Sequence, residues 1–142
     1  MSNLDVEENF LRARIVARLY HEGQMYGEHP YTYHLESVSN HFDTYTMKTI
    51  AYLHDILEDT DLDYGTLKVM FGAGIACTVE VLTRLPEEDY KDYIYRVEKS
   101  VVARAIKIAD LEENIKNNDN ESLVKRYTWA LNYLRREEHE PS

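Results

Sequence analysis

The run from His54 to Asp59 contains one imidazole and three carboxylates within six residues. A helix turns by about 100° per residue, so it would bring these polar side chains to one arc and the apolar ones to the opposite arc. The polar arc would hold His54, Asp55, Glu58 and Asp59. Imidazole and carboxylates on one face can bind a metal ion and move a proton of water. The solvated face of an amphipathic helix explains the same pattern, and this run alone leaves both interpretations open.

A second polar group interrupts a stretch that is otherwise apolar. Val101–Ile115 is apolar around most of its circumference, which predicts a central, buried helix. Lys107, Asp110 and Asn114 nevertheless line up on it, at spacings of three and seven residues. A buried charge without a partner is costly, so this stripe requires partners. One interpretation is a buried Lys107–Asp110 ion pair. The other, which we favour, is a metal ligand, Asp110, flanked by a cation that faces phosphate and by an amide.

The third candidate is His34, one turn into a helix that we expect to begin at Pro30. Taken singly, His34 is most simply a packed or capped side chain. Together, two imidazoles and two carboxylates suit a divalent transition ion such as Mn²⁺, Fe²⁺, Co²⁺ or Zn²⁺. Such an ion lowers the pKa of its bound water. Glu58 and Asp59 lie within a helical turn of that water and could orient or deprotonate it.

The elements that must position these residues are all predicted to be helices. The chain has 142 residues, five glycines and three prolines, and no segment alternates as a strand would. We expect a single domain over residues 1–142, with a core at about 11–134 and a short charged C-terminal tail. The segment Gly23–His29 is predicted to be a loop. The expected helices span about 5–22, 30–42, 46–60, 63–71, 73–84, 89–98, 101–116 and a final stretch from about 121 to 134.

Composition narrows the classes of function. The formal net charge of −10 argues against tight, nonspecific nucleic-acid binding, which needs clustered cations. It permits a small anionic substrate, because a bound metal can invert the local field. Cys77 is the only cysteine, so no intramolecular disulfide forms. No apolar run approaches about 20 residues and the first ten residues are acidic, so we expect no membrane span, no signal peptide and a cytoplasmic location.

The ordered pattern of His34, His54-Asp55 and Asp110 resembles the HD-domain metal-dependent phosphohydrolases. The resemblance is closest to the hydrolase domain of RelA/SpoT-type proteins and to the stand-alone small alarmone hydrolases. It extends from about Leu11 to Leu134. The matching stretches are Ala17–Gln24, Pro30–His34, Ala51–Thr60, Phe71–Gly72, Leu82–Arg84 and Ile106–Leu111, with Asn114 beyond them.

The resemblance implies an all-α fold, a compact single-domain bundle of about seven or eight helices around one metal ion, most often Mn²⁺. It implies that Glu58 and Asp59 handle the attacking water. The implied metal ligands are His34, His54, Asp55 and Asp110. The implied contacts to substrate phosphate or ribose are Lys107, Asn114, Arg84, Gln24 and Tyr31.

The implied activity is hydrolysis of a nucleotide, which in the alarmone-specific members removes pyrophosphate from the 3′ position of ppGpp. The sequence departs from that branch at two places. Met25 and Tyr26 stand where alarmone hydrolases have basic residues, and Glu112 and Glu113 precede Asn114 with no arginine after it. A substrate as anionic as ppGpp would prefer the missing cations, so the metal chemistry is better supported than the alarmone. We expect 23–29 and 85–95 to shape the substrate mouth.

Three other interpretations remain open from the sequence. Within enzymes, the chain could be a phosphohydrolase of nucleoside 5′-monophosphates, which releases phosphate rather than pyrophosphate. In a different class, it could be a non-catalytic helical module with a structural metal, although such a site has no need of Glu58 and Asp59. It could also be a helical interaction protein, for which the ordered match of so many site residues would be coincidence.

Overall fold

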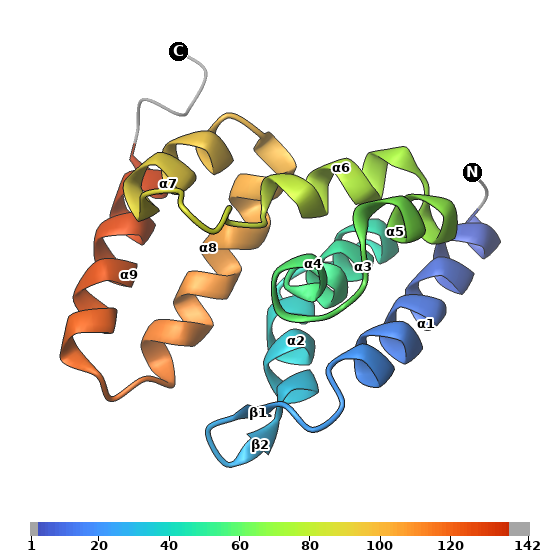
Figure 1. The fold of residues 1–142 in the computed structure, drawn as a ribbon, viewed down its shortest axis with the longest axis horizontal. Coiled ribbons are helices and arrows are strands. Elements are labelled where there is room, and N and C mark those ends of the chain that lie inside the picture. The colour runs from blue at the N-terminus through green and yellow to red at the C-terminus, as the bar shows by residue number, and fades with distance from the viewer. Residues whose placement is uncertain (1–2, 137–142) are drawn as a thin grey trace.

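The protein is described by a computed structural model over residues 3–136, so most of the charged tail predicted from the sequence lies outside the described residues. The predicted all-α class is confirmed (Figure 1). The helices are α1 (Asn3–Tyr20), α2 (Tyr31–Ser39), α3 (Tyr45–Leu53), α4 (Ile56–Asp59), α5 (Tyr64–Phe71), α6 (Ala73–Val81), α7 (Tyr90–Glu98), α8 (Val101–Lys116) and α9 (Glu121–Arg135). No helix within residues 3–136 is both long and apolar enough to cross a membrane.

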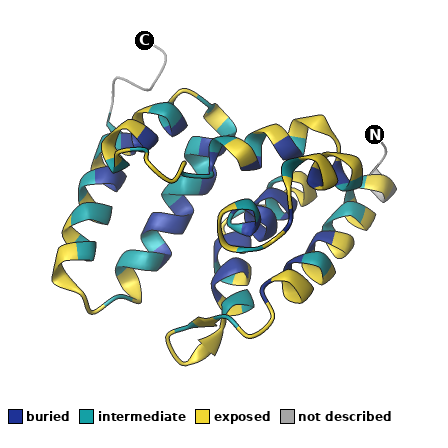
Figure 2. Cartoon of the chain, in the orientation of Figure 1, coloured by how far each residue is buried: buried dark blue, intermediate teal, exposed yellow. Residues whose placement is uncertain are grey.

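Helix α8 is the central element of the bundle. It packs against α2, α3 and α6 on one side and against α7 and α9 on the other, and α1 covers α3 from outside (Figure 1). Its middle turns are among the most buried parts of the chain (Figure 2). The alanines Ala103 and Ala109 allow close approach of neighbouring helices, and burial of Ile106 and Leu111 stabilises the fold by about 1.5–3 kcal/mol each. The predicted bounds of this helix are confirmed.

The single helix predicted over about 46–60 is wrong, because the chain breaks at its most informative residues. Helix α3 ends at Leu53 and the short α4 begins at Ile56. Between them, Asp55 has φ −104° and ψ 1°, in the bridge region where many active-site residues lie. The polar residues therefore do not share one helical arc. The break turns His54 inward at the end of α3 and sets Asp55 at the corner.

The predicted loop before α2 contains a small hairpin that the sequence did not reveal. Strands β1 (Met25–Tyr26) and β2 (His29–Pro30) pair antiparallel, with Met25 opposite Pro30. Gly27 has φ +60°, a conformation that glycine adopts without steric cost and that the tight turn requires. Strands of two residues are too short to show the alternation by which strands are recognised.

The connection between α6 and α7 is held by one half-buried guanidinium group. Arg96 donates to the carbonyls of Val81 and Thr83 at 2.9 Å, and to both carboxylate oxygens of Glu88 at 2.8 and 2.9 Å. Helix α6 consequently ends at Val81 and not near residue 84 as expected, because these carbonyls bond to the arginine. This connection carries Arg84 toward the centre of the molecule.

Candidate metal centre and adjoining pocket

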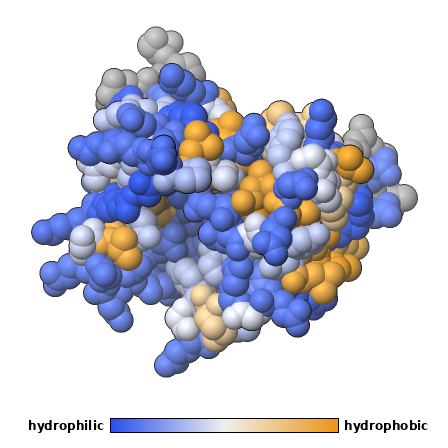
Figure 3. All heavy atoms as spheres, viewed as in Figure 1, coloured by the Kyte–Doolittle hydropathy of each residue, from blue (hydrophilic) through white to orange (hydrophobic). Residues whose placement is uncertain are grey.

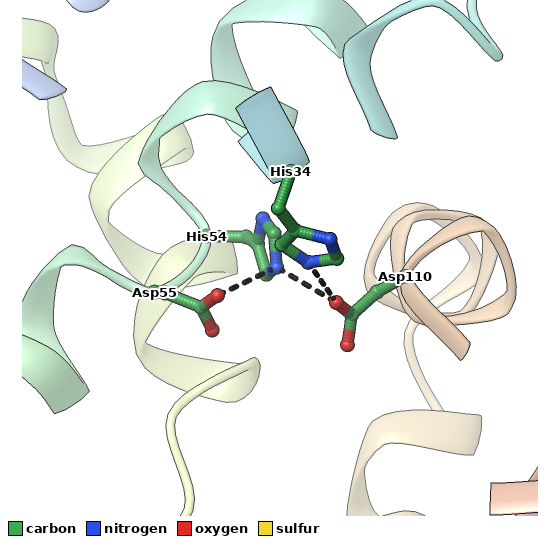
Figure 4. A group of neighbouring side chains, drawn as sticks. All are labelled: His34, His54, Asp55 and Asp110. Carbon is green, nitrogen blue, oxygen red and sulfur yellow. Dashed lines mark hydrogen bonds and ion pairs between the residues drawn. The ribbon is translucent and has the colours of Figure 1, made fainter. Parts of the chain in front are cut away.

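Four side chains from three elements meet beside α8. His34 comes from α2, His54 and Asp55 from the α3–α4 junction, and Asp110 from α8 (Figure 4). One potential ligand atom from each lies within 4.8 Å of all the others. His34 Nε2 is 2.7 Å from Asp110 Oδ1, and His54 Nε2 is 3.2 Å from the same oxygen. The structure thus brings together the four residues that the sequence predicted as ligands.

The imidazole of His54 is oriented by the backbone behind it. Its Nδ1 lies 2.6 Å from the carbonyl oxygen of Ala51, so Nδ1 donates to that carbonyl and Nε2 faces the site. A hydrogen bond of this kind typically fixes the tautomer of a metal-binding histidine. Nε2 also lies 3.0 Å from Asp55 Oδ2. Burial opposes the charged form, but the carboxylates of Asp55 and Asp110 raise the pKa of His54 well above its ordinary value. The two carboxylates thus stabilise positive charge at His54 Nε2, which either a proton or a metal ion can supply.

His34 is held by an aromatic ring rather than by a second hydrogen bond. Its imidazole stacks on Tyr26 with ring centroids 4.4 Å apart. The hydroxyl of Tyr26 donates to Asn114 Oδ1 at 2.8 Å, which connects the hairpin to α8. Within residues 3–136, the buried Nδ1 of His34 has no hydrogen-bond partner. The orientation of this candidate ligand therefore depends on the predicted loop, through Tyr26.

Asp55 is fixed by a tyrosine at the start of α2. The hydroxyl of Tyr31 donates to Asp55 Oδ2 at 2.5 Å, and its ring stacks on the buried His21 at 4.9 Å. Burial and the negative charge of Asp55 raise the pKa of Tyr31, which keeps it a donor. Burial also disfavours charge on Asp55, but the imidazole of His54 lowers the pKa of Asp55 to about 2. Asp55 is thus an anion with one oxygen oriented toward the centre.

The ion pair considered from the sequence exists, and it is part of the same cluster. Lys107 Nζ donates to Asp110 Oδ2 at 2.9 Å, while Asn114 Nδ2 donates to Oδ1 at 3.2 Å. Burial opposes the charge on Asp110, but Lys107 and His54 lower the pKa of Asp110 well below its usual range. The ion pair and the ligand arrangement use different oxygens of one carboxylate, so the two interpretations are compatible.

The donor set fits a divalent transition ion. Ions of this kind bind imidazole nitrogen and carboxylate oxygen at about 2.0–2.2 Å, which places two ligands of one ion at most about 4.4 Å apart. The candidate ligand atoms here all lie within 4.8 Å of one another, so shifts of a few tenths of an ångström would bring all four onto one ion, and three of the four residues are buried. Two carboxylates with neutral imidazoles would balance the charge of such an ion. The four residues therefore form a possible site for one divalent metal.

A pocket of about 220 Å³ opens beside this cluster. Glu58 and Asp59 line it from α4, and Glu58 Oε1 accepts a hydrogen bond of 2.7 Å from the backbone N–H of Arg84. Burial and the charge of Asp55 raise the pKa of Asp59 to about 6. Burial is also the main cause of the raised pKa of Glu58. The two acids thus face the candidate ligands from the open side.

Four of the five substrate contacts expected from the resemblance also line this pocket, and they are Tyr31, Arg84, Lys107 and Asn114. Gln24 does not line it. Gln24 Nε2 donates to the carbonyl of Asp59 at 2.9 Å, and Gln24 Oε1 lies 2.8 Å from His21 Nδ1. Both ends of this amide are engaged within the protein, where they hold the end of α4. A role of Gln24 in substrate contact stays a prediction.

The rest of the wall includes Tyr90 and Tyr93, from the segment 85–95 that was expected to shape the substrate mouth, and Arg126 and Tyr127, to which the sequence assigned no role. One available signal is composition, because the chain has 12 tyrosines and several of them surround this pocket. The surface is hollowed between the helices α7 and α9 and the helices α1 to α5, and the atoms around the hollow are largely hydrophilic (Figure 3). The wall thus combines aromatic rings with both signs of charge.

Comparisons with known proteins identify the fold. No family model matches the chain, and no curated protein matches it in sequence. Among solved structures, the chain is similar to a metazoan ortholog of SpoT that hydrolyses ppGpp and plays a role in starvation responses. The TM-score is 0.73 at 22% sequence identity, over 89% of this chain and 85% of that chain. This likeness shows that the chain has the fold of that SpoT ortholog, in agreement with the fold that the resemblance predicted.

Proposed function

We propose that the protein is a metal-dependent phosphohydrolase that acts on a nucleotide. The observation that carries this proposal is the convergence of two imidazoles and two carboxylates within 4.8 Å, next to a pocket with two further acids. A purely structural site would not need Glu58 and Asp59 on its open side. Two neighbouring carboxylates repel each other there, and the charge of Glu58 contributes to the raised pKa of Asp59. The likeness to the fold of a ppGpp hydrolase supports the same class of reaction.

The proposed ligands are His34, His54, Asp55 and Asp110. Mn²⁺ is the proposed ion, and Fe²⁺, Co²⁺ and Zn²⁺ suit the same ligands. Such an ion supplies a bound water of lowered pKa and polarises a phosphoryl oxygen. The protein supplies the orientation of the ligands, because Ala51 holds His54 and Tyr31 holds Asp55 by hydrogen bonds.

Glu58 and Asp59 are the proposed groups for proton transfer. The pKa of Asp59, raised to about 6 by burial and by Asp55, suits a carboxylate that exchanges protons near neutral pH. Glu58 is oriented by the backbone N–H of Arg84 and lines the pocket, and its other carboxylate oxygen has no hydrogen-bond partner within residues 3–136. Glu58 would orient the attacking water, and Asp59 would accept or return its proton.

Lys107, Arg84 and Asn114 are proposed to contact the phosphoryl group and the ribose. A pocket of about 220 Å³ accommodates a phosphate or pyrophosphate group but not a whole nucleotide. The leaving nucleotide must therefore lie outside it. As the finer proposal, the scissile group is the 3′-pyrophosphate of ppGpp, which the likeness to a ppGpp-hydrolysing protein supports.

Product release from a nucleotide panel tests the proposal. Purified protein is stripped of metal and then assayed with and without Mn²⁺ against ppGpp, pppGpp and ribo- and deoxyribonucleoside mono- and triphosphates. We expect Mn²⁺-dependent pyrophosphate from ppGpp. Phosphate from monophosphates alone would replace the alarmone with the 5′-nucleotidase alternative. No Mn²⁺-dependent product from any nucleotide would overturn the proposed activity and favour the non-catalytic module.

A further inference from the structure

A second pocket lies between the start of α7 and helix α9, and we name it the distal pocket. Its volume is about 610 Å³, and it is lined by Arg84, Asp89, Tyr90, Lys91, Arg126 and Trp129. Arg84, Tyr90 and Arg126 also line the smaller pocket at the candidate metal centre. The two pockets therefore adjoin, and a ligand that extends beyond the first would enter the second.

The charge of the distal pocket is opposite to that of the chain as a whole. The protein has 26 acidic and 16 basic residues, yet this lining has three cations and one acid. The acid, Asp89, is the N-cap of α7 and accepts a hydrogen bond of 2.9 Å from the backbone N–H of Lys91. Within residues 3–136, neither Lys91 nor Arg126 has a carboxylate partner. These cations remain available to an anion.

Aromatic rings hold two of these cations in place. The guanidinium carbon of Arg126 lies 3.8 Å from the ring centroid of Tyr90, and Lys91 Nζ lies 5.2 Å from that of Trp129. Attraction between a cation and a ring face is modest and leaves the hydrogen-bond donors of the cation free. The hydroxyl of Tyr90 is buried and has no hydrogen-bond partner within the described part of the chain. The pocket therefore offers positioned donors without acceptors to occupy them.

The pocket beside the β1–β2 hairpin offers no such cations. The pocket beside the β1–β2 hairpin is lined without any lysine or arginine, and Glu28 and Asp119 contribute negative charge to it. An anionic ligand would be repelled on the hairpin side and attracted on the α7–α9 side. The part of an anionic substrate that extends beyond the metal centre would therefore lie on the α7–α9 side and not on the hairpin side.

We propose that the distal pocket binds a phosphate group of the nucleotide substrate that is not cleaved, with Arg126 and Lys91 as its principal donors. The inference rests on the proposed function, because the scissile group is taken to occupy the smaller pocket. Arg84 and Arg126 stand at the boundary of both pockets and would contact the substrate between its two phosphorylated positions. The cations absent after Gln24 are thus replaced by cations from α7 and α9.

The single tryptophan of the chain provides a direct test, because Trp129 lines the distal pocket. Its emission is followed in the intact, metal-free protein during titration with guanosine 5′-diphosphate, guanosine or inorganic pyrophosphate. Without metal, the acids of the candidate centre repel anions, so binding there contributes little. We expect guanosine 5′-diphosphate and pyrophosphate to change the emission in a salt-sensitive manner, and guanosine to leave it unchanged.

Variants identify the donors. Lys91→Met is expected to weaken binding of guanosine 5′-diphosphate about fivefold and Arg126→Met about tenfold, as for loss of one hydrogen bond of ordinary net strength. Lys91 is exposed, so its replacement leaves the fold intact, and circular dichroism checks this. Lys125→Met, an exposed neighbour of Arg126 outside the pocket, is the matched control and is expected to bind as wild type.

Three results would overturn the inference. They are no change of emission at millimolar diphosphate, an equal response to guanosine, or equal losses in Lys91→Met and the Lys125→Met control. Mn²⁺-dependent hydrolysis measured on the same preparations separates this outcome from failure of the proposed function. Hydrolysis without diphosphate binding would reject the distal pocket alone, and diphosphate binding without hydrolysis would reject the activity alone.

Discussion

The smaller pocket beside the candidate metal centre shares two arginines and a tyrosine with the distal pocket, but the centre and the distal pocket balance charge in opposite ways. At the centre, buried groups of opposite charge meet at 2.7–3.2 Å, and each candidate ligand contacts at least one other. In the distal pocket, the exposed Lys91 and the half-buried Arg126 lie on aromatic rings and have no carboxylate partner within residues 3–136. Burial requires compensation of charge, whereas solvent tolerates its absence. The metal centre is therefore suited to a cation held in one geometry, and the distal pocket is suited to an anion that binds reversibly.

The largest expected effect comes from removing the carboxylate on which the centre depends. Asp110→Ala removes the partner of both imidazoles and of Lys107, so we expect loss of bound metal and of hydrolysis. Leaving Lys107 buried without its partner should also lower the free energy of unfolding by about 3 kcal/mol. Elemental analysis and thermal unfolding measure both effects, with the exposed Asp61→Ala as control. If Asp110→Ala kept its full metal content, Asp110 would not be a metal ligand.

A second variant separates proton transfer from metal binding. Glu58→Gln keeps an oxygen that accepts from the backbone N–H of Arg84, so the local structure should persist. We expect normal metal content and a fall in turnover of about 10²–10⁴-fold, the usual contribution of a positioned acid or base. The exposed Glu87→Gln, at the same connection, is the control. Unchanged turnover would exclude Glu58 from the chemistry.

Lys107 tests where the centre ends and the phosphate contacts begin. Lys107→Met removes an ammonium group that donates a hydrogen bond to Asp110 Oδ2 and lines the pocket. We expect kcat/KM for a phosphate substrate to fall about 10- to 100-fold, with metal still bound by the other oxygen of Asp110. Steady-state kinetics beside metal analysis measures this. Lower stability with unchanged kinetics would leave Lys107 as the ion-pair partner alone.

The smallest effect concerns the acid on the open side. In the metal-free protein, burial and Asp55 raise the pKa of Asp59 from 3.8 to about 6. The folded state therefore binds this proton more tightly than the unfolded state, and stability is lost as pH rises from about 4 through 6. Asp59→Asn should remove that loss.

Because Asp59 still meets solvent, we expect Asp59→Asn to gain only about 1 kcal/mol at pH 7 and almost nothing near pH 4. Thermal unfolding of the metal-free protein at both pH values measures the difference. The exposed Asp61→Asn is the control, and it should be neutral at both. Equal effects of Asp59→Asn at pH 4 and pH 7 would contradict the raised pKa.

Local patterns accounted for much of the fold. The apolar circumference of Val101–Ile115 predicted the central helix correctly, and Asp63 and Asp89 cap helices near the positions expected. Such features depend on neighbours within one or two turns, so they can be recognised in a single sequence. The break at Asp55 could not, because no glycine or proline marks it. Buried contacts of His54 and Asp55 with distant residues stabilise a backbone conformation that the local sequence does not favour.

The types and order of the residues by themselves indicated which side chains could hold a metal, since two imidazoles and two carboxylates suit a divalent transition ion. Only the tertiary structure decided their surroundings. His34 meets Asp110 across 76 residues, and Tyr26 reaches Asn114 across 88. The distal pocket likewise combines Lys91 of α7 with Arg126 of α9, and no local sequence pattern indicates that these two cations meet. Contacts between residues so far apart depend on how whole helices pack, and the periodicity of a sequence records only which face each helix buries.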